Sequence, residues 1–114
     1  MDSGAKIYIN RALNEMSLAE VAFTISNTKK IKEILRIDED MTYYSAVISH
    51  AYYSIFYMAK AILLTKGIKT ESPEIHRKTF DAFKKELVET GILDVKLLEI
   101  YKEMVVRADT LLEI

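Results

Sequence analysis

The apolar positions of this chain recur with the period of an α-helix, most densely between residues 43 and 66. Ile48, Tyr52, Ile55 and Ile62 fall on one helical stripe. Further apolar side chains lie on both flanks of that stripe: Val47, Ala51, Met58 and Leu63. A helix that is apolar nearly all the way round is typical of one buried among several others. The pattern therefore predicts a central helix that is covered on more than one side.

Glycine and proline mark where the predicted helices begin and end. Gly67 and Gly91 each follow an apolar run and precede an isoleucine, so each is expected to end a helix in the left-handed conformation, as in a Schellman motif. Ser72 and Pro73 predict an N-cap followed by the first helical residue. Asp40 is a candidate cap for the central helix. The predicted long helices span residues 4–25, 41–66, 73–90 and 94–114.

These ranges predict an all-α protein, an up-and-down helical bundle of four to five helices that forms one domain over residues 1–114. The segment 27–37 is either a short extra helix or a continuation of the first one. The last helix is apolar over a wide arc and has no stop signal before the chain ends. We therefore expect a homodimer that uses this helix and part of the central one. A further C-terminal segment or another chain would complete it.

Composition and motifs exclude several classes of site. There is no cysteine, and the net charge of −1 gives no electrostatic support for nucleic-acid binding. Neither a Gly-rich phosphate loop nor a His-Glu-x-x-His or Glu-x-x-His pattern occurs, so no cofactor and no metal is expected. No signal peptide and no charge-free apolar run of roughly 18 residues is visible. A cytoplasmic protein without membrane contact is expected.

Polar and aromatic side chains on the helical stripes are the candidate ligand or polar-network residues. They are His50, Tyr53, Tyr57, His76, Arg107 and Asp109. His50 is either a general base or a ligand of a phosphate or base edge, or else a core or interface histidine satisfied by a tyrosine or carboxylate. His76 shares a stripe with Phe80 and Phe83 in the first turn of its predicted helix, where backbone N–H groups disfavour a positive charge. The tyrosines either stack on a nucleobase or pack in the core. Arg107 and Asp109 either serve a polar site or lie on the surface.

Several segments together carry a family resemblance. They are residues 44–56, 61–68, 83–93 and 107–109, with His76 between the second and the third. In this set the chain resembles the HEPN domain from about residue 43 to residue 109, and the N-terminal helix resembles it more loosely. The most specific parts are Ala-Tyr-Tyr at 51–53 and Lys-Gly-Ile at 66–68.

This resemblance implies a small helical bundle, usually a homodimer, often encoded beside a minimal nucleotidyltransferase in a toxin–antitoxin-like pair. Active members are metal-independent RNases in which an arginine and a histidine on a late helix are separated by four to six residues. After Arg107 those positions hold Leu112, Glu113 and Ile114. Relatives often carry arginine where this chain has His50. The RNase motif is therefore broken, and the family's catalytic residues do not carry over.

Three functions follow from this reading. The first is a non-catalytic binding module that partners a minimal nucleotidyltransferase and binds a nucleotide or RNA. The alternative is a metal-independent, toxin-like RNase with an atypical active site made of His50, His76 and Arg107. A structural adaptor that binds no nucleotide is the third.

Overall fold

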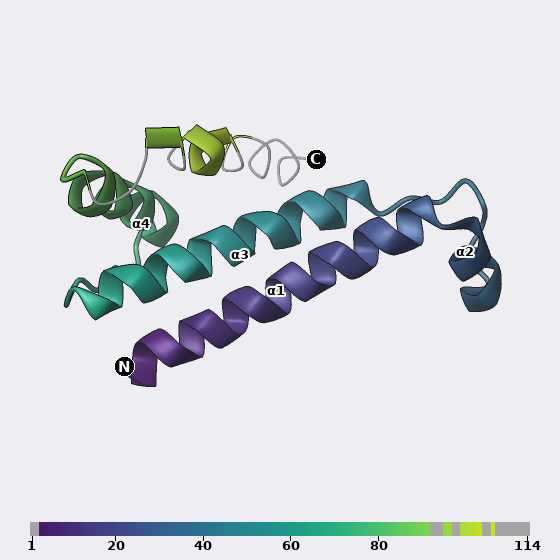
Figure 1. Ribbon diagram of the computed structural model, residues 1–114, viewed down its shortest axis with the longest axis horizontal. Helices are drawn as coiled ribbons and strands as arrows, with labels where there is room; N and C mark the ends of the chain where they lie inside the picture. Colours follow the sequence, from purple (N-terminus) through teal and green to yellow (C-terminus); the bar gives the residue numbers. More distant parts are fainter. Residues whose placement is uncertain (1–2, 92–94, 97–98, 104–105, 107–114) are drawn as a thin grey trace.

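The protein is an elongated helical bundle. The computed structural model describes residues 3–91, 95–96, 99–103 and 106, and these residues contain no strand. The helices are α1 (Ser3–Asn27), α2 (Lys29–Leu35), α3 (Tyr44–Thr65) and α4 (Ile75–Phe83), and a π-helical turn, η1 (Lys84–Val88), follows directly. The principal extents are 48 × 29 × 28 Å (Figure 1). The predicted all-α class is confirmed.

Helices α1 and α3 run antiparallel and lie side by side over most of their length (Figure 1). Small buried residues recur every seven positions along the face of α1 that meets α3: Ala5, Ala12, Ala19 and Ser26. Side chains of this size let the two backbones approach closely. The hydroxyl of Ser54 on α3 donates to the carbonyl oxygen of Ala12 at 2.9 Å, across the seam. We call this contact the alanine seam.

The main core lies between α3 and the later helices. Its buried members are Tyr52, Phe56, Ala59, Leu63, Phe83, Leu87 and Tyr101. Helix α3 therefore has α1 along one side and α4 with its following turn along another (Figure 1). This arrangement confirms that the central helix is covered on more than one side.

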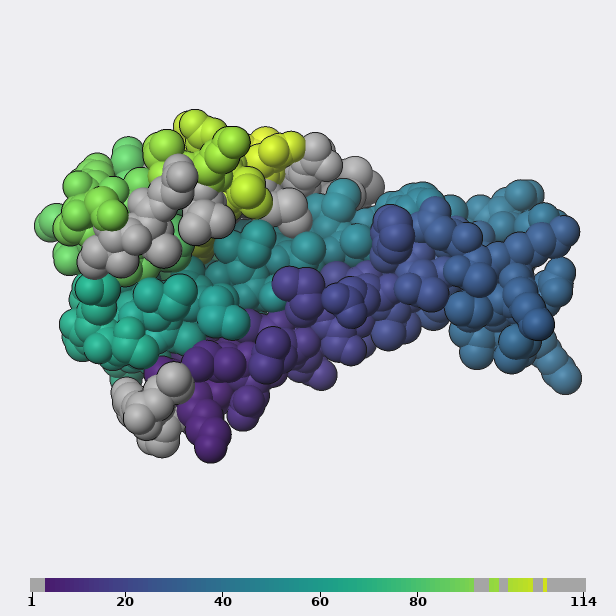
Figure 2. Space-filling view, in the orientation of Figure 1, coloured from purple at the N-terminus to yellow at the C-terminus, as the bar shows by residue number. Residues whose placement is uncertain are grey.

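Helix α2 is separate from α1, which decides between the two readings of residues 27–37. Thr28 takes an extended backbone between the two helices, with φ −125° and ψ 101°. Arg36 then ends α2 in the left-handed region, with φ 58°. The ammonium of Lys32 donates to the carbonyl oxygen of Glu39 at 2.9 Å and holds the following loop against α2. Together, α2 and this loop project from one end of the bundle (Figure 2).

The end of α3 has the predicted Schellman geometry. Gly67 has a φ of 76°. The amide of Ile68 donates to the carbonyl of Leu63 at 2.9 Å, and the amide of Gly67 donates to the carbonyl of Leu64 at 3.0 Å. Gly91 also has a positive φ, of 80°. Its partner in the predicted motif, Ile92, lies outside the described residues.

Two of the predicted helix starts are wrong, those of the central helix and of the helix over 73–90. Helix α3 begins after Tyr43 rather than after Asp40, because the Tyr43 amide donates to the hydroxyl of Ser26 at 2.7 Å and ties the chain to the end of α1. Helix α4 begins at Ile75 because Glu74 takes a left-handed backbone, with φ 56°. The Ser72-Pro73 pair therefore lies in the loop, and its peptide bond is cis.

The predicted helix over 73–90 divides into an α-helix and a π-helical turn. In that turn the amide of Glu89 donates to the carbonyl of Lys84 at 2.9 Å, five residues back. The turn keeps both Phe83 and Leu87 buried. The predicted last helix, 94–114, lies largely outside the described residues; its described positions, 95–96, 99–103 and 106, are helical.

Helix α3 is long and apolar enough to cross a membrane, a test that the core helix of a helical bundle also passes. In this fold α3 is the helix on which α1 and α4 pack. The predicted cytoplasmic location, without membrane contact, stays a prediction.

Candidate functional site

A row of aromatic rings connects α1, α3 and α4. The rings of Tyr8 and Tyr57 are stacked, with centroids 6.0 Å apart. Tyr57 is followed by Tyr53 at 6.1 Å, and Tyr53 by His76 at 5.8 Å. The His76 ring also lies 4.2 Å from that of Phe56. The structure thus brings together three residues of the predicted set, Tyr53, Tyr57 and His76.

His76 is held by the core of the bundle. It lies in the first turn of α4, and its Nδ1 atom is 2.5 Å from the hydroxyl oxygen of Tyr52. Tyr52 is itself buried in the main core. This bond gives the buried phenol the partner that it needs and anchors the start of α4 to α3.

His50 is held from the other side of α3. Its Nδ1 atom lies 2.5 Å from Oε2 of Glu15 on α1. The two side chains are 34% and 20% exposed, so the pair lies at the rim of the alanine seam. Both histidines of the chain therefore have a ring nitrogen bound to a side chain of a neighbouring helix.

Arg11 and Lys60 were not among the predicted site residues. The Arg11 guanidinium carbon lies 5.5 Å from the ring centroid of Tyr8 and 5.8 Å from that of Tyr57. The ammonium of Lys60 lies 4.6 Å from the Tyr8 centroid and donates to the carbonyl of Thr70 at 3.2 Å. Lys60 is only 6% exposed. A lysine inside the apolar stripe of α3 was the one sequence signal for this cluster.

Glu15 was also missed. It is an ordinary charged residue of a long helix, and its partner is 35 positions away in the sequence. Only the packing of α1 on α3 identifies it. Arg107 and Asp109, the remaining predicted site residues, lie outside the described residues. The part of the chain that the structure describes has no cluster of three or more side chains suited to hold a metal ion.

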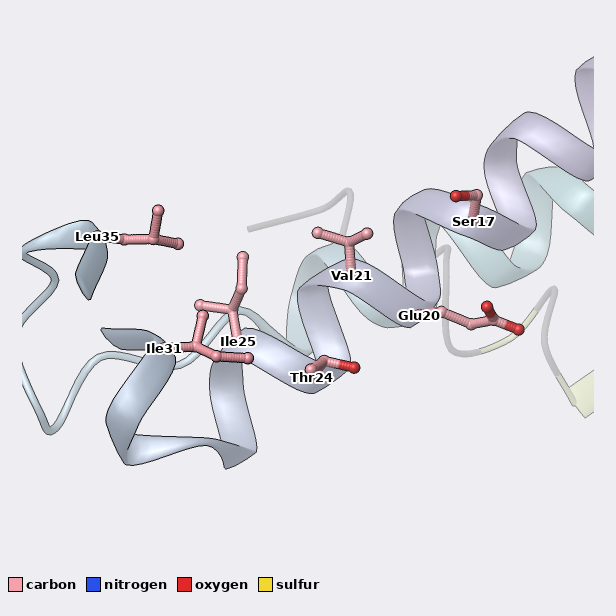
Figure 3. Close-up of a pocket in the computed structure, with 7 residues that line it drawn as sticks. All are labelled: Ser17, Glu20, Val21, Thr24, Ile25, Ile31 and Leu35. Carbon is pink, nitrogen blue, oxygen red and sulfur yellow. The ribbon is translucent and has the colours of Figure 1, made fainter. Parts of the chain in front are cut away.

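Of the grooves along α1, three bear on the candidate site. One, of about 410 Å³, lies between α1 and α2 and has the apolar side chains of Val21, Ile25, Ile31 and Leu35 on its walls (Figure 3). The other two lie on either side of Arg11. The larger of these, of about 480 Å³, is lined by Ile7, Asn10, Arg11, Asn14, Glu15 and Tyr57. The smaller, of about 400 Å³, is lined by Gly4, Ile7, Tyr8, Arg11, Leu64 and Lys69.

Tyr101 places a polar atom in the main core. Its ring meets those of Phe80 and Phe83 edge-on, with centroids 5.1 Å and 5.5 Å away. Among the described residues, its buried hydroxyl has no hydrogen-bond partner. Burial, with a smaller contribution from Tyr52, raises the pKa of this hydroxyl well above its ordinary value of 10.0. The side chain is therefore neutral and serves packing.

Comparison with known proteins gives a family and a relative. Residues 25–105 match the family model of the HEPN domain. Over 78 residues the chain is 37% identical to a candidate toxin of Methanocaldococcus jannaschii, an alignment that covers 66% of this chain and 51% of the relative. The chain therefore spans about half the length of that protein. No solved structure matches the chain significantly.

Proposed function

Because the chain belongs to the HEPN domain family, we propose that it is a non-catalytic binding module, the dimeric partner of a minimal nucleotidyltransferase in a toxin–antitoxin-like pair. The observation that carries this proposal is the state of the two histidines. His50 is bound to Glu15 of α1, and His76 to Tyr52 of α3. Each bond holds two helices together, which supports a structural role for both rings.

The described surface also favours a macromolecular partner. Large apolar side chains of α1 and α2 are exposed by about half or more: Ile7, Leu13, Val21, Phe23, Ile34 and Leu35. Of these, Val21 and Leu35 lie together in the groove between α1 and α2, and an exposed apolar patch is a mark of protein–protein contact. Ile25 and Ile31 complete the apolar walls of this groove (Figure 3). We therefore place the nucleotidyltransferase contact on α1 and α2.

Co-expression tests the proposal. The proposal predicts a minimal nucleotidyltransferase gene beside the gene of this chain, and the two proteins should co-elute from a size-exclusion column. Leu35→Glu should weaken the complex at least tenfold, because it puts a charge in the wall of the groove between α1 and α2. Lys66→Glu, a charge change at the exposed end of α3, should leave it unchanged. The absence of a complex, or equal effects of the two substitutions, would contradict the proposal.

The alternative function is a toxin-like RNase. It is favoured by the description of the M. jannaschii relative as a candidate toxin. Its proton transfers would need a histidine, because arginine stays charged, and the atypical set would be His50, His76 and Arg107. We expect purified protein to cleave RNA no faster than background. Cleavage that His50→Ala or Arg107→Ala abolishes, with the circular dichroism spectrum unchanged, would establish the RNase instead.

A further inference from the structure

Two neighbouring grooves follow the C-terminal half of α1. The first is the groove between α1 and α2 with its apolar walls (Figure 3). The second, of about 430 Å³, lies between α1 and α3 and is lined by Ala19, Glu20, Phe23, Thr24 and Val47. Because Glu20 and Thr24 line both grooves, the two form one surface. We call it the Glu20 surface.

Glu20 is the only charged side chain among the described residues that line the Glu20 surface, and the lysines of α2 line neither groove. The other charged residue of α1 between positions 12 and 27 is Glu15, which is bound to His50. Within the described residues, Glu20 itself makes no ion pair. A partner that covered this carboxylate without a positive charge would leave it buried and unpaired, which is costly. The phosphates of a nucleic acid would be repelled.

A helix is the form of protein segment that fits this surface. The part of the chain that the structure describes contains no strand, so it offers no sheet edge to an extended segment. An extended segment would also leave backbone N–H and C=O groups without partners against the apolar walls, whereas a helix satisfies them internally. Val21 and Ile25 on α1, and Ile31 and Leu35 on α2, are each four residues apart, the spacing of the ridges by which helices pack.

From these observations we propose that the Glu20 surface binds an amphipathic helix of a protein partner, and that this helix carries one lysine or arginine within its apolar stripe. Its apolar side chains contact Val21 and Leu35, and its basic side chain pairs with Glu20. This inference rests on the proposed function, because it takes α1 and α2 as the contact with the nucleotidyltransferase. It adds the form and the charge of the segment that binds there.

Two designed helical peptides of about 18 residues, five helical turns, test the proposal. Both have a stripe of leucines, with alanine and glutamine elsewhere, and they differ only at one central position of the stripe, which is lysine or glutamate. Fluorescence anisotropy gives their dissociation constants. The wild-type protein should bind the lysine peptide about fivefold more tightly than the glutamate peptide. This difference should shrink at high salt, which screens the ion pair.

Substitutions separate the charge from the apolar contact. Glu20→Lys should reverse the preference, so that the glutamate peptide binds more tightly than the lysine peptide. Asp81→Lys makes the same change of charge at an exposed position of α4 and should keep the wild-type preference. Leu35→Ser should weaken the binding of both peptides by the same factor, because it removes apolar contact without changing the charge.

A preference that Glu20→Lys does not reverse would overturn the proposal, as would the absence of binding by both peptides at concentrations on the order of 1 mM. The peptide measurements need no nucleotidyltransferase. Peptides that bind as expected, without co-elution of the two proteins, would contradict the proposed partnership alone. Co-elution combined with failure of the peptides would contradict the helix-binding proposal alone.

Discussion

The Nδ1 atom of His50 on α3 lies 2.5 Å from Oε2 of Glu15 on α1. This contact joins two helices that meet through the small side chains of the alanine seam and through the stacked rings of Tyr8 and Tyr57. It is one of the few directional contacts that fix how far α1 extends along α3. Its partial exposure, 34% for His50 and 20% for Glu15, means that water weakens the interaction without removing it.

A double-mutant cycle measures that contact. We expect Glu15→Gln and His50→Gln each to lower the free energy of unfolding by about 0.5–1.5 kcal/mol, with a coupling of about 0.5–1 kcal/mol between them. Urea denaturation of the four proteins gives the values. A coupling near zero would mean that the two side chains do not interact in solution.

Phe83 should be a large contributor to stability. It is 7% exposed and belongs to the main core. Phe83→Ala should lower the free energy of unfolding by about 3–5 kcal/mol, enough to threaten a marginally stable fold. Phe23, which is 54% exposed on α1, provides the matched control, and Phe23→Ala should cost less than about 1 kcal/mol. Similar losses at both positions would contradict the described packing.

Tyr101→Phe should stabilise the protein, and most clearly at high pH. The substitution removes a buried hydroxyl without a described partner, which should raise the free energy of unfolding by about 1 kcal/mol. Burial raises the pKa of this hydroxyl in the folded state above its unfolded value of 10.0. Above pH 10 the Tyr101 hydroxyl therefore loses its proton in the unfolded chain while it keeps it in the folded protein. The free energy of unfolding of the wild-type protein consequently falls as pH rises.

The measurement for Tyr101 is chemical denaturation of wild-type and Tyr101→Phe protein between pH 8 and pH 11. The difference in stability should be constant below pH 10 and should grow above it. Because the two proteins differ only at position 101, the difference isolates Tyr101. A difference that stays constant through pH 11 would show that the hydroxyl is accessible to solvent.

The proposed homodimer remains to be tested by sedimentation. Its expected interface, the last helix with part of α3, exposes Val95, Ile100 and Tyr44 in the described residues. Wild-type protein at a concentration on the order of tens of micromolar should sediment as a dimer. Ile100→Glu should shift it to monomer, whereas Leu13→Glu on α1 should not. Monomeric wild-type protein at this concentration would contradict the proposal.

Helical periodicity and glycine were sufficient to predict the class of fold and the end of α3. The two predicted helix starts failed for a different reason. Capping residues act locally, whereas the start of α3 is set by the bond between Tyr43 and Ser26, 17 positions apart. Asp40 carried no information about that bond.

The candidate site likewise divides into residues that local sequence patterns predict and residues that only helix packing identifies. Tyr53, Tyr57 and His76 were predicted from their helical stripes, and they do lie in one row of rings. Glu15 and Arg11 were missed because their roles depend on how α1 lies against α3. The sequence alone does not specify how α1 and α3 lie against each other, so it could not identify these two residues. Arg107 and Asp109 fall outside the described residues, so their part of the prediction stays a prediction.

The alanine seam has a consequence for how α1 finds its place. Ala5, Ala12 and Ala19 follow one another every seven residues, so sliding α1 along α3 by about 10 Å, seven helical rises, again presents alanine to the same neighbours. At the alanine seam, steric fit alone thus allows several nearly equivalent positions. The bonds from Glu15 to His50 and from Ser26 to Tyr43 are satisfied in only one of them. Those polar contacts therefore select one position of α1 along α3 among the positions that the small side chains of the alanine seam would permit.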